Sequence, residues 1–315
     1  MNLTSNFLQK QSSFLLENPR ITWCVIGGFS VLPITAWIAL AIMSLITLRN
    51  GLVEGFKCLI IALTVSICIA ELQGIAQFDN WSIVLSSASV NAVLCYMLAC
   101  ILGVWSSWQV VAAAALSIAV LINTSFHVFA PNLIEQQYYI LLNLLKTFDQ
   151  GQVVAQLIHA QNANGILKLA YYLFGIKLLS IVISAITPIL FARYVQSILF
   201  YIGEFKKEML AFRANRLILM LLILSILGAH QDNLLSISCL PMFFVYLMIA
   251  GVSLILDFLA KKLVANKSKA VAYTILFVPT IIIPYIILPL YVAFGSLDSL
   301  FNLRSRWNVI DCKNK

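Results

Sequence analysis

The feature that most constrains the fold is a succession of long apolar runs separated by short polar connections. A helix rises about 1.5 Å per residue, so about 20 apolar residues cross the roughly 30 Å hydrocarbon core of a bilayer. The sequence therefore predicts an all-α, polytopic transmembrane helical bundle of about eight spans, with residues 1–315 forming a single integral membrane domain. The predicted spans are residues 22–48, 54–72, 81–104, 109–123, 166–197, 216–228, 234–259 and 270–293.

The composition agrees with a membrane protein. Hydrophobic residues make up 62% of the chain, charged residues make up 10%, and the mean hydropathy is +0.97. Soluble domains carry about 25% charged residues. The net charge of +8 comes from basic residues in the short connections, where they act as topology signals and contact anionic lipids. We therefore expect the lipid bilayer, and not nucleic acid, as the partner of these charges.

Two stretches outside the spans predict amphipathic helices at the membrane surface. Residues 132–162 place leucines at helical spacing among polar residues, and could lie on the membrane or cap a vestibule. Residues 203–215 place an apolar face opposite a basic one. We expect this second helix to bind lipid or to dock a membrane or ATPase partner at the cytoplasmic face. The candidate surface comprises Arg193, Phe205, Lys206, Lys207, Met209, Phe212 and Arg213.

The distribution of basic residues predicts the orientation of the middle of the chain. The connections before residue 216 and after residue 259 are rich in Lys and Arg, which places both in the cytoplasm. The connections that contain Asp79 and Asp232 have neither Lys nor Arg and are expected outside. Eight spans would then place both termini outside, although both are basic. Either one apolar run does not fully span, or the termini are exceptions.

Polar residues inside the apolar runs mark a candidate site. Lys177 lies about 13 Å along the helix from Lys168, too deep for easy snorkelling. Three hydroxyl residues follow it on the same helical face. Lys177 could form a structural ion pair with Glu71 or line a ligand or ion pathway, and Asn91 could bond a neighbouring helix or a ligand. The candidate intramembrane polar site comprises Lys177, Ser180, Ser184, Thr187, Glu71 and Asn91.

The last predicted span contains three prolines, Pro279, Pro284 and Pro289. Each proline removes a helix hydrogen bond, which must be compensated within the bundle. The span is either broken and lines an internal site, or is bent and packs against its neighbours.

Sequence signatures of soluble enzymes are absent from the chain. It contains no His-Glu-x-x-His, Gly-x-Ser-x-Gly, Gly-x-x-x-x-Gly-Lys-Ser/Thr or Gly-x-Gly-x-x-Gly. The three histidines are isolated, and the seven cysteines are scattered without a Cys-x-x-Cys. The sequence predicts a protein that is not an enzyme and has no catalytic residues, metal site or cofactor.

The end of the fifth predicted span carries a specific pattern of a charged helix end, a turn, a charged amphipathic segment and another apolar run. Its residues are Arg193-Tyr194-x-Gln196-x-x-Leu199-Phe200, then Gly203-x-Phe205-x-x-Glu208 and Arg213. Further similarities are Thr47-Leu48-Arg49-x-Gly51, Ser107-Trp108 and Leu297-Asp298-x-x-Phe301-x-x-Arg304. The pattern resembles the YybS-like family of bacterial integral membrane proteins, although the family turn usually has Asn-Pro-Gly-Gly where this chain has Tyr201-Ile202-Gly203-Glu204.

The resemblance implies a multi-pass protein of the bacterial inner membrane. More distantly, such proteins are similar to the substrate-binding membrane components of energy-coupling-factor transporters, an analogy at the level of fold. Two functions follow as expectations. One is a small-molecule-binding or transport component with a cavity among residues 81–104, 166–197 and 270–293. The other is a non-transporting accessory or scaffold protein of the cell envelope.

Overall fold

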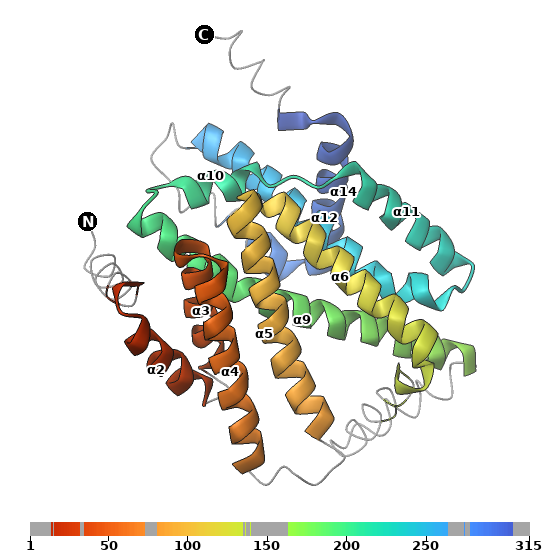
Figure 1. Cartoon of the computed structure of the whole chain (residues 1–315). Helices are drawn as coiled ribbons and strands as arrows, with labels where there is room; N and C mark the ends of the chain where they lie inside the picture. Colours follow the sequence, from red (N-terminus) through yellow and green to blue (C-terminus); the bar gives the residue numbers. More distant parts are fainter. Residues whose placement is uncertain are drawn as a thin grey trace. The chain divides into compact units, whose positions relative to one another are not determined.

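The structure, a computed structural model, describes residues 14, 16–31, 35–72, 81–134, 136, 139, 163–263, 274 and 278–304. The regular elements in this part of the chain are helices, without a strand (Figure 1). They are α2 (Pro19–Ser30), α3 (Ala36–Asn50), α4 (Leu52–Leu72), α5 (Trp81–Trp105), α6 (Trp108–Phe129), α9 (Ala163–Leu199), α10 (Glu204–Ala211), α11 (Arg216–His230), α12 (Leu234–Leu263) and α14 (Pro284–Phe301).

The chain divides into two compact units, and α6, α9 and α10 each contribute residues to both. The first unit consists of Met1–Ala114 and Ser180–Met209. The second consists of Ala115–Leu179 and Leu210–Lys315. Each unit has its own helix packing, so each is described separately.

In the first unit, α3 packs against α2, α4 and α5 (Figure 1). Its core includes Leu45 of α3 packed on Ala192 and Val195 of α9. The Ser44 hydroxyl and the Cys95 thiol lie 3.3 Å apart and join α3 to α5. The apolar contacts hold the last turns of α9 against α3, and the contact of Ser44 with Cys95 holds α3 against α5.

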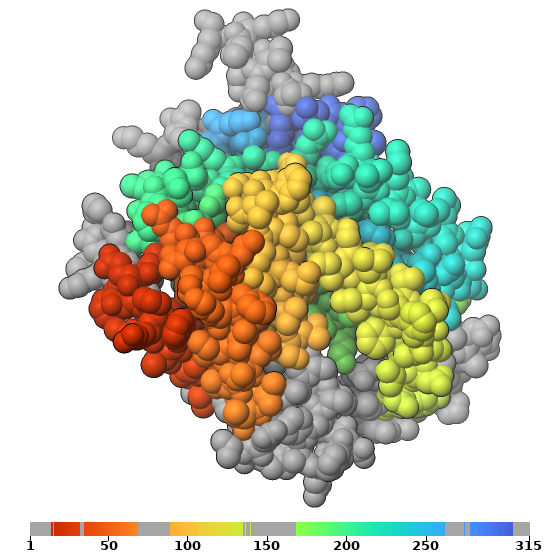
Figure 2. Space-filling model, viewed as in Figure 1, coloured from red at the N-terminus to blue at the C-terminus, as the bar shows by residue number. Residues whose placement is uncertain are grey.

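In the second unit, α12 packs against both α11 and α14. The α12–α14 contact depends on two glycines, because a Cβ at Gly251 would overlap the backbone carbonyl of Tyr291 and one at Gly295 would overlap that of Leu247. Small residues allow helix backbones to approach this closely in membrane proteins. By contrast, α11 exposes many large apolar side chains, and its turquoise atoms lie at the surface in Figure 2.

Helix length and composition indicate a membrane-embedded protein. Among the described residues, four helical segments are long and apolar enough to cross a membrane: Trp108–Phe129, Lys168–Leu199, Leu234–Lys261 and Pro284–Phe301. A fifth results if α10 and α11, which meet at a bend of 45°, are counted as one span. The all-helical class is confirmed, whereas the prediction of about eight spans is not.

The first predicted span differs from the structure. Residues 22–48 do not form one helix but belong to α2 and α3, which pack against each other. A continuous apolar run does not distinguish a bent helix from two helices joined by a break, which is why the sequence predicted a single span here.

The last predicted span also differs. The helix breaks at Ile283, and α14 then runs from Pro284 past residue 293 to Phe301. Proline suits the first turn of a helix because the amide N–H that it lacks has no partner there. The end of α14 contains polar residues, among them Asp298 and Ser299. Asp298 stays within it because this carboxylate has an arginine partner.

The predicted surface helices are only partly described. Residues 203–215 form a shorter helix than expected, since α10 covers Glu204–Ala211 and residues 212–215 connect it to α11 without helical structure. Of the predicted helix over 132–162, the structure describes residues 132–134, 136 and 139, which are helical. The remainder lies outside the described residues.

Candidate binding site

The end of α9 and the start of α10 together build a polar site in the first unit. After α9, the chain reverses through residues 200–203, where Gly203 has a φ of 89° that an L side chain rarely adopts. The Ser197 hydroxyl stabilises this turn, donating to the Tyr201 carbonyl at 3.0 Å and accepting from the Phe205 amide at 3.3 Å. The rings of Tyr194 and Phe205 pack edge to face. The turn therefore directs α10 back toward α9.

This arrangement brings Arg193 of α9 to Glu208 of α10. The Arg193 guanidinium forms an ion pair with Glu208, and its Nε donates to Glu208 Oε2 at 3.2 Å. Its Nη1 donates to Gln196 Oε1 at 2.8 Å, one helical turn further along α9. From α6, the Trp108 indole N–H donates to the same Glu208 oxygen at 3.1 Å. The two charged side chains are only 14% and 20% exposed, so the pair is largely shielded from solvent.

A pocket of about 510 Å³ lies beside this ion pair. One wall is apolar and comes from α3 and α5, while α9 and α10 supply the charged groups. The hydroxyl groups come from Ser106, just after α5, and from Tyr201 in the turn. The charged lining contains two basic and two acidic side chains, so its formal charges balance. The lining residues are Leu48, Leu102, Gly103, Ser106, Arg193, Gln196, Tyr201, Glu204, Lys207 and Glu208.

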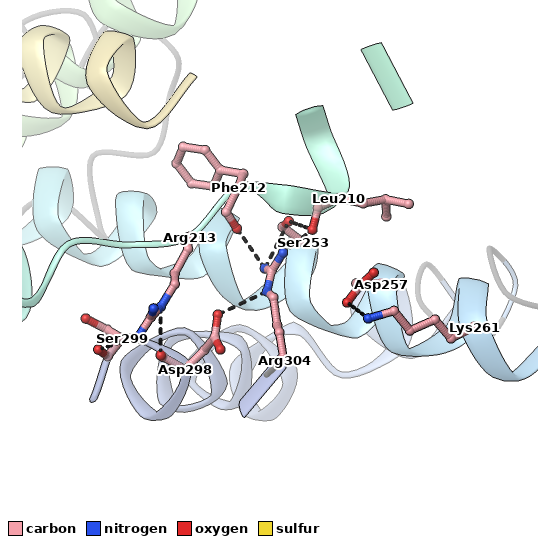
Figure 3. Close-up of polar contacts among 9 residues, drawn as sticks. All are labelled: Leu210, Phe212, Arg213, Ser253, Asp257, Lys261, Asp298, Ser299 and Arg304. Atoms are coloured by element: carbon pink, nitrogen blue, oxygen red, sulfur yellow. Dashed lines mark hydrogen bonds and ion pairs between the residues drawn. The ribbon is translucent and has the colours of Figure 1, made fainter. Parts of the chain in front are cut away.

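A second polar cluster lies in the second unit, at the end of α14 (Figure 3). Asp298 is fully buried, and its Oδ2 accepts from Arg304 Nε at 3.1 Å. The same guanidinium donates to the backbone carbonyls of Leu210 and Phe212 and to the Ser253 hydroxyl. Figure 3 shows Arg304 reaching from the α14 side to these groups. The arginine thus fixes the chain that follows α10.

Two further arginines bond the carbonyl groups at the end of α14. Arg213 donates to the carbonyls of Asp298 and Ser299, each at 3.0 Å. Arg216 donates to Ser299 and Leu300 at 3.4 and 3.3 Å. The last carbonyls of a helix have no partner within the helix and carry partial negative charge, which cationic side chains stabilise. This cluster acts as a helix cap.

The predicted intramembrane polar site is only partly assembled. Ser184 of α9 donates to Asn91 Oδ1 of α5 at 3.0 Å within the first unit. Lys177 belongs to the second unit and is exposed, as are the three hydroxyl residues that follow it, and Thr187 bonds a carbonyl of its own helix. The Glu71 side chain lies outside the described residues. The pairing of Lys177 with Glu71 therefore stays a prediction.

The predicted lipid or docking surface is divided among different environments. Lys206 and Lys207 are exposed, while Phe205 and Met209 are half-buried. Phe212 is buried against Tyr246, which corrects its assignment to the surface, because α10 ends before this residue and helical spacing no longer applies. Arg193 and Arg213 are engaged in the two clusters described above.

The partners of these arginines were not predicted from the sequence. Trp108, Gln196 and Glu208 were not among the candidate site residues, although all three stand in the sequence patterns described above. Asp298 and Arg304, which belong to one of those patterns and form an ion pair, were not among them either. The spacing of the motifs was the signal that could have identified both clusters.

The described residues include no group of three or more His, Cys, Asp or Glu side chains placed to hold a metal ion. What the first cluster offers instead is a preformed pocket with charges of both signs. Comparisons of the chain with protein-family models, curated proteins and solved structures found no match.

Proposed function

We propose that this membrane-embedded protein binds a small polar molecule in the pocket beside Arg193 and Glu208. The observation that carries the proposal is the pocket itself, whose volume of about 510 Å³ falls in the range of about 300–1,000 Å³ typical of ligand sites. The proposed setting is the bacterial inner membrane, with the protein acting as the binding component of a transport system.

The geometry around the pocket supports binding because its charged groups are held in place before a ligand arrives. Glu208 is fixed by Arg193 from α9 and by Trp108 from α6. A site that is already ordered loses less conformational entropy when a ligand binds. The exposed Lys206 on α10 offers a charged contact for a partner subunit at the same end of the first unit.

The second candidate function is that of a non-transporting scaffold of the cell envelope. The observation that favours it is the Arg304 cluster, in which the charged side chains mainly bond backbone carbonyls and one another. Such contacts stabilise a helical bundle without requiring a ligand.

Filling the pocket tests the proposal. In the Gly103→Leu variant the new side chain extends from a pocket-lining position, where a Cβ meets only Leu48, at 3.8 Å. The control is Gly28→Leu, since Gly28 is a helical glycine in the same unit where a Cβ would have no neighbouring atom within 4 Å. The measurement is native mass spectrometry of protein released from its own membrane fraction.

The expected result is a bound small molecule in the parent protein and in Gly28→Leu that is lost in Gly103→Leu. Equal retention in both variants would overturn the proposal of a site in this pocket. Co-purification of an ATPase subunit with the parent protein would favour transport, whereas a folded protein that carries neither ligand nor ATPase would favour the scaffold.

A further inference from the structure

Two opposite charges on α10 line the pocket without pairing with each other. Glu204 and Lys207 are three residues apart, the same order and spacing as Glu54 and Lys57 on α4. Glu54 and Lys57 form an ion pair at 2.6 Å, as is usual for this spacing on an exposed helix surface. Within the described part of the chain, neither Glu204 nor Lys207 takes part in an ion pair. The Glu204 carboxylate lies near enough to Arg193 to interact with it electrostatically, and both Glu204 and Lys207 are exposed, so a ligand can reach both.

The other charged pair in the pocket is already satisfied. The Arg193 guanidinium bonds Glu208 and Gln196, and Glu208 also accepts from Trp108. A ligand would thus meet one available ammonium, that of Lys207, and one available carboxylate, that of Glu204. Because these charges balance, a ligand with one charge of each sign fits better than one with a net charge.

The neutral groups of the pocket supply further donors. Besides the Lys207 ammonium, the hydroxyl groups of Tyr201 and Ser106 line the pocket, and a phosphate group can accept several such hydrogen bonds. The carboxylate of Glu204 only accepts, so it suits a primary ammonium, which donates three. These groups favour an ammonium phosphate zwitterion.

The apolar wall places the pocket at the level of lipid headgroups. Leu48 lies in the last turn of α3, which ends at Asn50, and Leu102 and Gly103 lie in the last turn of α5, which ends at Trp105. Trp105 is 67% exposed, and exposed tryptophans at helix ends are typical of the membrane–water interface. Apolar residues on this wall can contact the first carbons of an acyl chain.

We infer that the pocket binds the zwitterionic phosphoethanolamine group of phosphatidylethanolamine, with the phosphate at Lys207 and the ammonium at Glu204. This inference rests on the proposed function, because it names the ligand of the same pocket. Free glycerophosphoethanolamine carries the same ammonium and the same singly charged phosphodiester, and it differs from the lipid in lacking the acyl chains that the apolar wall would contact.

The test measures binding to the full-length protein in detergent by native mass spectrometry and isothermal titration. The probes are short-chain phosphatidylethanolamine, phosphatidylcholine and phosphatidylglycerol, together with free glycerophosphoethanolamine. We expect phosphatidylethanolamine to bind about tenfold more tightly than phosphatidylcholine, because the quaternary ammonium of phosphatidylcholine has no N–H to donate. A tenfold ratio of dissociation constants corresponds to the loss of about one hydrogen bond to a charged group. Equal affinity for the three lipids would overturn the inference.

Two variants assign the ends of the ligand. Glu204→Gln should abolish the preference for phosphatidylethanolamine over phosphatidylcholine, and Lys207→Gln should weaken the binding of both. The matched controls are Glu54→Gln and Lys57→Gln, which remove charges at the same helical spacing from a pair outside the pocket. If the Glu204 and Lys207 variants bind like these controls, the assignment is wrong.

The remaining arms separate the sources of the ligand and the two proposals. Tighter binding of the lipid than of free glycerophosphoethanolamine supports the lipid, whereas equal binding overturns the lipid as the ligand. If Gly103→Leu removes a bound molecule but phosphatidylethanolamine shows no preference, the pocket binds another ligand and only this inference fails. If Gly103→Leu removes nothing, the proposed function fails as well.

Discussion

The protein contains two arginine clusters, and the arginines of the two clusters bond different kinds of partner. In the first unit, Arg193 bonds the side chains of Glu208 and Gln196 beside a pocket that contains further charges. In the second unit, Arg304 bonds the buried Asp298 and two backbone carbonyls, and Arg213 bonds two more carbonyls. Among the described residues, the first cluster lies beside a pocket. Two charged side chains of that pocket, Glu204 and Lys207, take part in no described ion pair.

The difference indicates which cluster serves the fold and which serves binding. Backbone carbonyls are fixed by the helices that carry them, so an arginine bonded to several of them has little freedom to meet a ligand. The pocket beside Arg193 also contains Glu204 and Lys207, which take part in none of the described ion pairs and which a ligand can reach. The comparison predicts that changes in the Arg304 cluster mainly affect stability, while changes at the pocket also affect binding.

The largest loss of stability is expected for Arg304→Met. The variant leaves the fully buried Asp298 carboxylate without its partner and removes donors from two carbonyls. Removing one member of a buried ion pair costs about 3–5 kcal/mol in the free energy of unfolding. The control is Lys261→Met, which breaks the more exposed pair with Asp257 and should cost at most about 1 kcal/mol. Equal denaturation midpoints for the two variants in detergent would contradict a structural role for the cluster.

Breaking the first cluster is expected to cost somewhat less. Glu208→Met leaves the partly shielded Arg193 unpaired, with an expected loss of about 2–3 kcal/mol. Adding Arg193→Met should restore part of the stability, because no unpaired charge then remains, but should not restore ligand binding. The measurement is a double-mutant cycle on denaturation together with a binding assay. Strictly additive losses would mean that the two side chains do not act as a pair.

A smaller effect is expected for Trp108→Phe, which keeps an aromatic ring but removes the hydrogen bond to Glu208. A hydrogen bond to a charged group is worth about 1.5–3 kcal/mol, and we expect the lower end here because Glu208 retains Arg193. Trp105→Phe is the control, since that side chain is 67% exposed and the described contacts give it no such bond. A change in melting temperature that is the same for both variants would argue against the indole bond.

The predicted pair of Lys177 with Glu71 would make a third charged region, buried in the membrane. A double-mutant cycle with Lys177→Met and Glu71→Gln is expected to give a coupling energy of about 1 kcal/mol. Additive effects on the free energy of unfolding would refute the pair. Lys177 and Glu71 would then not form a third charged region beside the two arginine clusters.

The smallest effect is expected for Ser184→Ala, which removes the interhelical hydrogen bond to Asn91. Such bonds in membrane proteins average about 0.6 kcal/mol. Thr187→Val is the control, because the Thr187 hydroxyl bonds the Ile183 carbonyl in its own helix. If thermal unfolding does not distinguish the two variants, the bond between α5 and α9 contributes no stability.

Much of the helical architecture was predictable because apolar runs of sufficient length leave few alternatives. The fifth predicted span, residues 166–197, corresponds to α9, which continues through Pro188 from Ala163 to Leu199. The division of residues 22–48 into two helices was not predictable, because the break lies within an apolar run. In the last span, the three prolines predicted an irregular helix, and a break does precede Pro284.

The candidate site was less predictable than the helices. Charge alone identified Arg193 and Lys207, since charged residues near the end of an apolar helix are conspicuous. Their partners were not evident, because the contact of Trp108 with Glu208 joins residues far apart in the chain. Helical spacing describes one element at a time, and it carries no information on which elements meet.

The close approach of α12 and α14 limits how this sequence can change over evolution. At Gly251 and Gly295 the obstructing atoms belong to backbone carbonyls, so no substitution of a neighbouring side chain can make room for a Cβ. A drift away from glycine at either position would require the two helices to separate along their length. A library of random variants, selected for insertion and folding, should therefore retain both glycines while exposed positions on α11 diversify. The two glycine positions would therefore help to detect distant relatives whose overall sequence identity to this chain is low.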